Sequence, residues 1–215
     1  MPTQVLIVDD HPVLREGLTV YINTQPDLAV CGQAADTCQA MKMLEANRPD
    51  VVVVDIQLTD GNGLDLAERI KAHDKTIQVL VYSNYHDRLY TQRALQAGAS
   101  GYINKRHEAS RLVEAIRRVL HGGIFLSEET ADLLLTSAVG GRRQLRACGI
   151  AGLTNRELDI FRLVGQGLTT SRIAETLQRS VHTVEAHRTN IKEKLGLKTA
   201  AELSRSAVQW VLEYG

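Results

Sequence analysis

Short apolar runs recur along the first half of the chain. They cover residues 5–8, 28–31, 51–54, 77–81 and 101–103. Four of the five runs are rich in β-branched residues and almost uninterrupted by polar ones, which is typical of strands covered on both faces. The pattern therefore predicts five buried strands.

Between these runs, apolar residues follow helical spacing. After Pro12, which suits a first helical turn, they recur at Leu14, Leu18, Tyr21 and Ile22. A last helix has the apolar stripe Leu112, Val113, Ile116 and Leu120. Asp36 is a candidate helix cap, and Gly98 is a candidate end for a helix that begins near Arg88. Strands alternating with helices predict an α/β doubly wound five-stranded parallel sheet, flavodoxin-like, over residues 1–121.

Residues 122–149 have the composition of a linker that contains a short helix. Gly122 and Gly123 end the first domain, and Ser127 is a candidate cap for a short amphipathic helix that runs through residues 133–135. The Gly-Gly-Arg-Arg stretch at 140–143 indicates a flexible, solvated segment.

Residues 150–215 have helical spacing throughout and predict an all-α four-helix domain. Thr154 with Glu157, and Thr199 with Glu202, have the spacing of capping boxes. Between these boxes, two amphipathic segments flank the short turn at 178–180, which predicts a helix-turn-helix.

Composition and charge narrow the possible functions only slightly. The formal net charge is zero and 44% of the residues are hydrophobic. Residues 150–215 carry 9 Lys/Arg and 7 Asp/Glu, a small surplus that permits DNA binding without indicating it. The three cysteines lack metal or disulfide spacing, the N-terminus lacks a signal-peptide pattern, and no apolar stretch reaches roughly 18 residues. We therefore expect a cytoplasmic protein with no membrane segment.

Polar side chains follow the predicted strands at their carboxyl ends. These residues are Asp9, Asp10, Asp55, Ser83 and Lys105. In an open α/β sheet, such ends meet at one edge, where ligands bind. Three carboxylates together suit Mg²⁺. One of them can attack a phosphoryl group while the metal and the lysine neutralise the developing charge.

Each of these residues also has an ordinary explanation when taken alone. An Asp-Asp pair is more often a turn or a helix cap, and a single lysine is more often a solvated surface residue. A nucleotide- or flavin-binding enzyme needs a Gly-rich turn after the first strand, whereas this turn reads Asp9-Asp10-His11-Pro12. An enzyme of the flavodoxin-like class is therefore disfavoured.

The segments VLIVDDHPVLREGL, VVVVDIQLTDGNGLDL, LVYSNY and AGASGYINK resemble the receiver domain of bacterial response regulators. The segment ELDIFRLVGQGLTTSRIAETLQRSVHTVEAHRTNIKEKLGLKTAAEL resembles the LuxR-type helix-turn-helix. Together, in this order, they resemble the NarL/FixJ family of two-component response regulators. Thr59 departs from the proline common in the family, and Ser83 stands where threonine is common.

The resemblance implies roles for the residues at the acidic edge. The phosphorylation site is Asp55. The Mg²⁺ ligands are Asp9, Asp10, Asp55 and the main-chain carbonyl of Gln57. The phosphoryl-binding and switch residues are Ser83, Tyr102 and Lys105. On phosphorylation, Tyr102 is expected to turn inward, into the space that Ser83 vacates. Gln57 and Tyr85 are expected to flank the path of the hydrolytic water.

The resemblance also places DNA contacts on the second helix of the helix-turn-helix. If Val181, Val184, Ile191 and Leu195 face the core, the opposite face is free for the major groove. The candidate contacts are Thr169, Thr170, Arg179, His182, Thr183, Glu185, Ala186, Arg188, Thr189, Lys192 and Lys194. Many family members have Lys in place of Glu185, and a carboxylate there lowers affinity unless it accepts from a cytosine amino group. The alternative is a solvated amphipathic helix in a small bundle.

Together these features predict a DNA-binding transcriptional regulator that a sensor histidine kinase activates by phosphorylation of Asp55. Homodimers are expected on phosphorylation or on DNA. The receiver is expected to catalyse only its own phosphoryl transfer and dephosphorylation, and so is not classed as an enzyme. The alternative is a phosphorylation-independent regulator whose receiver serves for dimerisation or ligand binding. Trp210 and Val211, placed near the terminus, either belong to a dimerisation helix or pack on their own domain.

Overall fold

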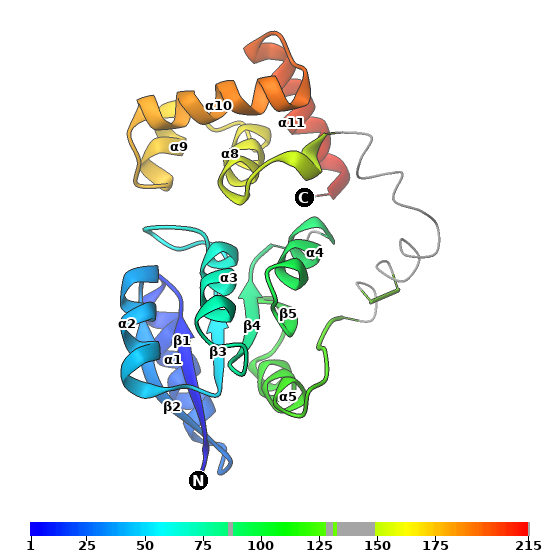
Figure 1. The fold of residues 1–215 in the computed structure, drawn as a ribbon. Coiled ribbons are helices and arrows are strands. Elements are labelled where there is room, and N and C mark those ends of the chain that lie inside the picture. Colours follow the sequence, from blue (N-terminus) through cyan, green and yellow to red (C-terminus); the bar gives the residue numbers. More distant parts are fainter. Residues whose placement is uncertain (86–87, 128–130, 133–148, 215) are drawn as a thin grey trace. The chain divides into compact units, whose positions relative to one another are not determined.

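The computed structural model describes residues 1–85, 88–127, 131–132 and 149–214 (Figure 1). Contacts between residues divide the chain into two compact units, one built around a sheet and the other from the C-terminal helices. The predicted helix through residues 133–135 and the predicted flexible stretch 140–143 lie outside the described residues. Among those described, no helix is both long and apolar enough to cross a membrane.

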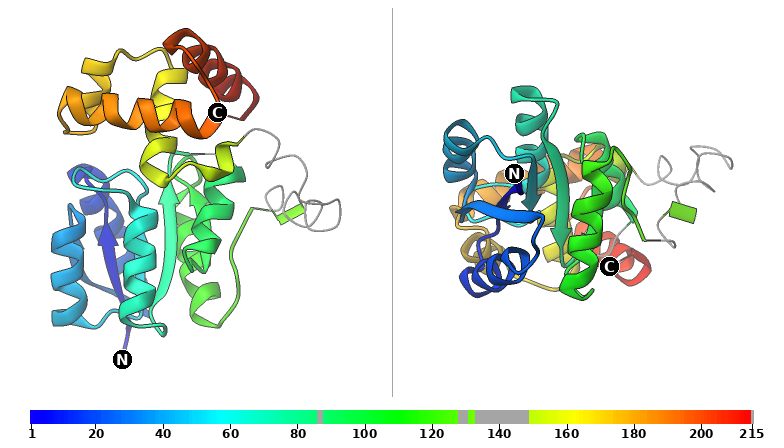
Figure 2. Two further views of the ribbon diagram at one scale, coloured as in Figure 1. Left: turned by 45° about the horizontal axis from the view of Figure 1, so that its top comes forward. Right: turned by 90° about the horizontal axis from the view of Figure 1, so that it is seen from below.

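The first unit is a five-stranded sheet with strand order β2-β1-β3-β4-β5 and parallel pairing throughout. Its strands are β1 (Thr3–Val8), β2 (Leu28–Ala34), β3 (Val51–Val54), β4 (Gln78–Ser83) and β5 (Gly101–Asn104). Its helices are α1 (Pro12–Asn23), α2 (Thr37–Asn47), α3 (Gly63–His73), α4 (Arg88–Gln96) and α5 (Ala109–Leu120). The predicted doubly wound fold is confirmed, with helices on both faces of the sheet (Figure 2).

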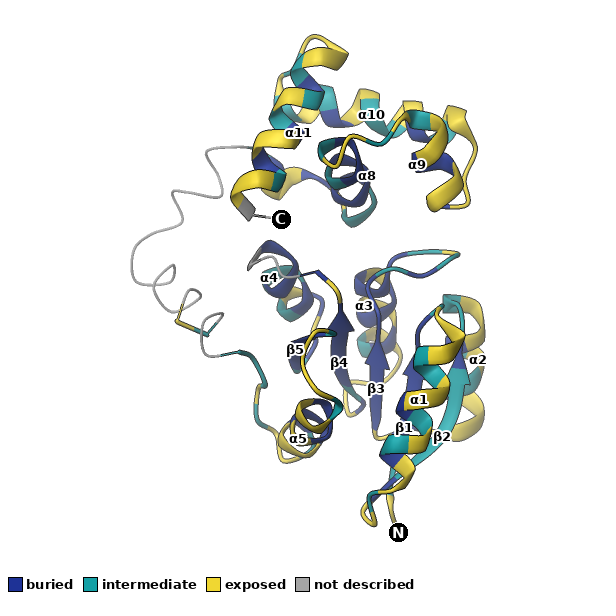
Figure 3. Cartoon of the chain, turned by 180° about the vertical axis from the view of Figure 1, so that it is seen from behind, coloured by how far each residue is buried: buried dark blue, intermediate teal, exposed yellow. Residues whose placement is uncertain are grey.

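Burial of the sheet explains the uninterrupted apolar runs. All four residues of β3 are buried, as are residues 5–8 of β1 (Figure 3). Alternate strand residues pack against α1 and α5, where Ile22 and Leu112 are fully buried. The register pairs Val8 with Val54, so β1 and β3 end level with each other. The residues that follow them therefore lie side by side.

Helix caps fix the loops at this end of the sheet. Asp36 accepts a hydrogen bond from the Gln39 amide, as predicted. Asn62, which the sequence analysis did not single out, caps α3 by accepting from the Leu64 amide at 2.8 Å. At the opposite end of the sheet, between α4 and the start of β5, Gly98 has φ +88°, in the left-handed region that favours glycine.

The second unit contains η1 (Ile150–Gly152), α8 (Asn155–Gly165), α9 (Thr170–Thr176), α10 (Val181–Leu195) and α11 (Ala200–Tyr214). Thr154 and Glu157 form the predicted capping box. At the second predicted box, the Glu202 amide donates to Thr199 Oγ1, but the Glu202 carboxylate accepts from the Lys198 amide instead of the cap amide.

One prediction about burial in this unit is wrong, and one question that the sequence left open is decided. Val181 does not face the core: it is 47% exposed because it begins α10 at the edge of the domain, whereas Val184 and Ile191 are buried. Trp210 is not exposed. It is 5% exposed and lies 5.8 Å from the Phe161 ring, so α11 packs on α8 through this residue.

After α5, the chain returns to the edge of the sheet. The Tyr102 amide donates to the Phe125 carbonyl at 2.9 Å, and the Phe125 amide donates to the Ser100 carbonyl at 3.1 Å. This isolated bridge extends the sheet beyond β5. One bridging residue leaves no periodic pattern, so it could not be predicted from the sequence.

Candidate functional site

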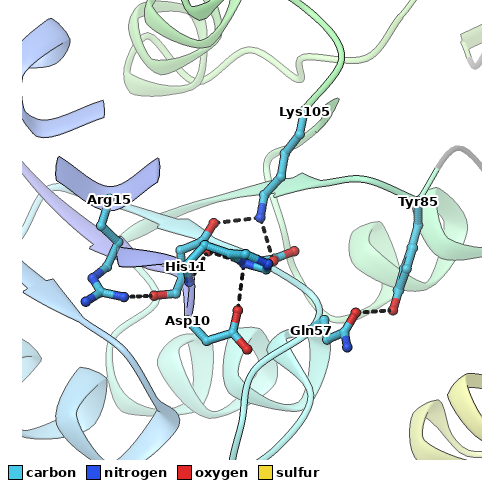
Figure 4. Close-up of polar contacts among 8 residues, drawn as sticks. Asp10, His11, Arg15, Gln57, Tyr85 and Lys105 are labelled. Carbon is cyan, nitrogen blue, oxygen red and sulfur yellow. Dashed lines mark hydrogen bonds and ion pairs between the residues drawn. The ribbon is translucent and has the colours of Figure 1, made fainter. Parts of the chain in front are cut away.

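Two buried aspartates lie side by side at the carboxyl ends of neighbouring strands. Asp9 follows β1 and Asp55 follows β3, and they are 2% and 4% exposed. The Asp55 amide donates to the Val8 carbonyl at 2.8 Å, which continues the sheet pairing up to the site. Asp10 lies next to them at the surface, and Figure 4 shows its side chain below His11.

Lys105 joins the two buried carboxylates. Its Nζ lies 2.6 Å from Asp9 Oδ2 and 2.6 Å from Asp55 Oδ2, and its side chain is 5% exposed. The Lys105 amide donates to the Ser83 carbonyl, which fixes the loop after β5 against the end of β4. The structure thus brings together Asp9, Asp55 and Lys105 from three strand ends.

Burial and charge oppose each other at these groups. Burial raises the pKa of Asp55, and the Asp9 charge adds to the rise, while Lys105 lowers it. Burial also raises the pKa of Asp10, which His11 partly offsets. For Lys105, burial alone lowers the pKa, but Asp55 and Asp9 outweigh it, so the pKa is raised. The lysine therefore holds its positive charge between the two carboxylates.

The same cluster fits a hard divalent cation. Asp9, Asp10, His11 and Asp55 each offer one ligand atom, and these atoms all lie within 4.8 Å of one another. Asp55 Oδ1 is buried without a hydrogen-bond partner among the described residues. Asp10 Oδ1 lies 2.8 Å from His11 Nδ1 as an ion pair, but without a well-aligned hydrogen bond. Clustered carboxylate oxygens that accept no hydrogen bond suit Mg²⁺.

The predicted switch residues are both buried. Ser83 is 1% exposed, and Tyr102 is 7% exposed, with its hydroxyl donating to the Tyr85 carbonyl at 2.5 Å. Asn104 Nδ2 donates to the same carbonyl at 3.2 Å. The Tyr102 ring therefore lies inside the domain in this structure, and the expected movement of Tyr102 on phosphorylation stays a prediction.

The side chains of Gln57, which follows β3, and Tyr85, which follows β4, contact each other. The Tyr85 hydroxyl donates to Gln57 Oε1 at 3.1 Å (Figure 4). Both residues were predicted to flank the path of the hydrolytic water, and this hydrogen bond shows that their side chains lie together.

Three residues that support the site were not predicted. His11 donates to Asp9 Oδ1 through its amide at 2.9 Å, and Arg15 Nη1 donates to the Asp9 carbonyl at 2.6 Å. At Gly63, an added Cβ would lie 1.9 Å from the Asp55 carbonyl oxygen. The two glycines at Gly61 and Gly63 are the sequence signal that could have indicated such a close approach.

The predicted DNA contacts cluster on α9, the turn before α10, and α10 itself (Figure 1). None of them is buried. The exposed ones are Thr169, Arg179, His182, Glu185, Ala186, Thr189 and Lys194, and the partly exposed ones are Thr170, Thr183, Arg188 and Lys192. The structure thus brings these residues into one region of the helical unit.

Several of these side chains already have partners within the domain. Lys194 Nζ pairs with Glu157 at 2.6 Å, and Thr170 Oγ1 donates to Glu185 Oε1 at 2.7 Å. Arg188, expected to extend outward, has a side chain only 14% exposed and lies 4.0 Å from Glu185. The exposed face is therefore less basic than the list of candidate residues suggests.

Comparison with known families assigns both units. Residues 5–117 match the response regulator receiver domain, and residues 151–207 match the luxR family of bacterial regulatory proteins. The chain is 32% identical over 212 residues to the nitrate/nitrite response regulator protein NarL of Escherichia coli, covering 98% of this chain and 95% of that protein. It is 33% identical over 210 residues to the oxygen regulatory protein NreC of Staphylococcus carnosus, covering 96% and 97%.

Solved structures agree with this assignment. RcsB of Salmonella typhimurium has the same fold at 22% identity, with a TM-score of 0.67 over 97% of this chain and 98% of that one. A LuxR-family regulator from Aurantimonas is 32% identical, with a TM-score of 0.59 over 61% of this chain and 94% of that one. The chain therefore belongs to the NarL-type two-component response regulators, with a receiver domain followed by a LuxR-type helix-turn-helix domain.

Proposed function

We propose that this protein is a transcriptional regulator whose DNA binding is controlled by phosphorylation of Asp55, with a sensor histidine kinase as the donor. The observation that carries the proposal is the position of Lys105, which contacts Asp9 and Asp55 at once through their Oδ2 atoms. A nucleophile needs an oxygen that no donor occupies, as at Asp55 Oδ1, and a transferring phosphoryl group needs a nearby positive charge.

In the proposed transfer, an Asp55 oxygen attacks the phosphorus of a phosphohistidine. The new phosphorus–oxygen bond forms as the phosphorus–nitrogen bond breaks, and the imidazole nitrogen leaves with the electron pair. The Lys105 charge lowers the pKa of Asp55 against the larger effect of burial, and the lysine can then follow the negative charge onto the phosphoryl oxygens. Asp9, Asp10, Asp55 and the Gln57 carbonyl would hold Mg²⁺, which when bound would further neutralise that charge.

Labelling with a small phosphodonor tests the phosphorylation site. Acetyl phosphate with Mg²⁺ is expected to add one phosphoryl group, detected by intact-mass spectrometry. Asp55→Asn is expected to abolish the adduct, because it keeps the shape but removes the nucleophile, and chelation of Mg²⁺ is expected to do the same. Asp65→Asn, an exposed carboxylate on α3, is the matched control. Equal labelling of the Asp55 variant would overturn the assignment.

DNA binding through α9 and α10 is supported by the family and by the exposure of the candidate contacts. RcsB, which shares the fold, has been solved bound to a promoter in the presence of a phosphomimetic. We propose that α10 enters the major groove while Thr169 and Arg179 face the phosphates. Because the proposed target is chromosomal DNA, the proposed site of action is the bacterial cytoplasm. The proposed catalysis is limited to the receiver's own phosphorylation and dephosphorylation.

We also propose a homodimer on phosphorylation or on DNA. Val208 and Leu212 on α11 are 41% and 82% exposed, and exposed apolar residues on a terminal helix suit contact with a second copy. Sedimentation of phosphorylated protein with and without DNA tests this, and Leu212→Asp is expected to weaken the dimer. A variant that dimerises like the wild type would exclude α11 as the interface.

A phosphorylation-independent regulator remains the second candidate, favoured by one feature. A groove of about 620 Å³ beside Lys105 is lined by apolar residues of α1, including Val13, which is 82% exposed. Such a groove suits a ligand or a second protein. Normal regulation by an Asp55→Asn variant in cells would favour this reading over control by phosphorylation.

A further inference from the structure

We propose that Glu185, held in place by Thr170, reads a cytosine in the target site. The proposal rests on the proposed DNA binding and adds the base that the recognition helix selects. Glu185 lies in the second turn of α10, and its side chain is 54% exposed. It therefore lies near the start of the helix, the part that meets base edges when a recognition helix enters the major groove.

The position of the Glu185 carboxylate is set by the neighbouring helix. Thr170, the first residue of α9, donates from Oγ1 to Glu185 Oε1 at 2.7 Å. A free glutamate on a helix surface samples many rotamers, and ordering it on DNA costs conformational entropy. The threonine removes part of that cost before DNA is bound. Because a hydroxyl has only one proton, Thr170 cannot also donate from its side chain to a phosphate.

Arg188 partly offsets the charge of the carboxylate. Its Nε lies 4.0 Å from Glu185 Oε1, and its side chain is 14% exposed. The positive charge of Arg188 so close to Glu185 reduces the repulsion between this carboxylate and the DNA phosphates. Glu185, Thr170 and Arg188 thus form a small polar cluster on the side of α10 that faces α9.

The chemistry of the bases selects cytosine for such a carboxylate. In the major groove, cytosine presents an amino donor, whereas guanine and thymine present acceptors that repel a carboxylate. Adenine also has an amino donor, but its adjacent N7 is an acceptor. A carboxylate therefore favours cytosine, and an amide, which can donate to N7 and accept from the amino group, favours adenine. Glu185→Gln keeps the side-chain length and makes this change.

Selection from a randomised DNA library tests the proposal with the full-length protein and acetyl phosphate. The wild type is expected to prefer cytosine at one position of each half-site by at least about fivefold, the effect of a 1 kcal/mol mismatch. Glu185→Gln is expected to shift the preference at that position to adenine. Thr170→Val is expected to reduce the cytosine preference, and Thr170→Ser, which keeps the hydroxyl, to retain it.

The control is Glu193→Gln, an exposed residue of α10 outside the proposed contacts, which should leave both the cytosine preference and the binding to DNA of unrelated sequence unchanged across a range of salt. If the wild type bound no DNA under any condition, the proposed function itself would fail. If it bound DNA but Glu185→Gln selected the same sites, the role of Glu185 would be overturned while DNA binding stood. If Thr170→Val kept the full cytosine preference, the positioning role of Thr170 would be overturned.

Discussion

At the scale of single residues, the buried charge of Lys105 compensates two carboxylates at once. Removing one partner of a buried ion pair costs about 3–5 kcal/mol, because the remaining charge stays buried and unpaired. Lys105→Met is therefore expected to lower the free energy of unfolding by about 3 kcal/mol in the presence of a chelator. Mg²⁺ is expected to restore more stability to this variant than to the wild type, since the cation supplies the missing positive charge.

Urea unfolding of both proteins, with chelator and with Mg²⁺, measures this effect. Lys75→Met, which removes an exposed lysine of the same domain, is the control and should change neither value. A Lys105 variant that lost the same stability with and without Mg²⁺ would show that the lysine and the cation do not share the same carboxylates.

Gly63 carries a second residue-scale prediction. Its amide donates to the Ile56 carbonyl at 2.7 Å, and an added Cβ would lie 1.9 Å from the Asp55 carbonyl oxygen. Gly63→Ala must therefore displace the backbone at the phosphorylation site. The expected results are a loss of about 1–3 kcal/mol in unfolding free energy and slower labelling by acetyl phosphate. Gly17→Ala, where a Cβ meets nothing within 4 Å, is the control. Normal labelling of Gly63→Ala would mean that the loop absorbs the methyl group away from Asp55.

The acidic residues of the site could be predicted from the sequence because each follows a strand whose burial pattern is unmistakable. Asp9 and Asp55 are placed by topology alone, since parallel strands end at one edge of the sheet. Arg15 and Gly63 could not be assigned to the site, because they approach the main-chain carbonyls of Asp9 and Asp55, which no side-chain pattern reveals. The hydrogen bond from Tyr102 to the Tyr85 carbonyl could not be predicted either, because no side-chain pattern reveals a backbone partner.

At the scale of elements, the start of α8 is linked to the end of α10 by Glu157. Its carboxylate accepts from the Thr154 amide at 2.7 Å and pairs with Lys194 at 2.6 Å. Burial raises the pKa of Glu157, but the Lys194 and Thr154 contacts outweigh it, so the net pKa is lowered. A lowered folded-state pKa gives stability that is present above the unfolded-state pKa and is lost as pH falls through the folded-state value.

We therefore expect Glu157→Gln to destabilise the C-terminal domain at neutral pH and to differ less from the wild type as the pH falls below about 4.3. Thermal unfolding between pH 3 and pH 7 measures the difference. Glu193→Gln, an exposed glutamate next to Lys194, is the control. A difference between Glu157→Gln and wild type that stayed constant with pH would indicate lost packing and not a lost charge.

Helix caps could be predicted from the sequence because they depend on local signals. The burial of single helix residues could not, because it depends on packing between helices. Asp36 and Thr154 cap their helices as predicted because a cap needs only its own first turn. Val181 was assigned to the core by helical spacing, but spacing cannot tell that α10 begins beyond its neighbours. The sequence allowed Trp210 either in a dimerisation interface or packed on its own domain. Its contact with the Phe161 ring on α8 shows that it packs on its own domain.

At the scale of the whole molecule, the neutral net charge is compatible with DNA binding because the relevant charge is local. The helix-turn-helix domain has only a small positive surplus, and three of its basic side chains, Arg172, Arg188 and Lys194, lie close to glutamates. One copy should therefore bind weakly. Two copies that engage half-sites about one helical turn, roughly 34 Å, apart gain affinity from effective concentration.

The final prediction is that the receiver restrains DNA binding until Asp55 is phosphorylated. The helical unit has its own buried core around Phe161 and Trp210, so residues 150–215 are expected to fold and bind DNA alone. Phosphorylation of the full-length protein should raise its affinity for a repeat of two half-sites, with little change for a single half-site. Titrations of both proteins at two salt concentrations measure this, with Asp55→Asn as the control that acetyl phosphate should not affect. If the unphosphorylated full-length protein bound as tightly as the isolated domain, restraint by the receiver would be wrong. Dimerisation alone would then have to account for the response.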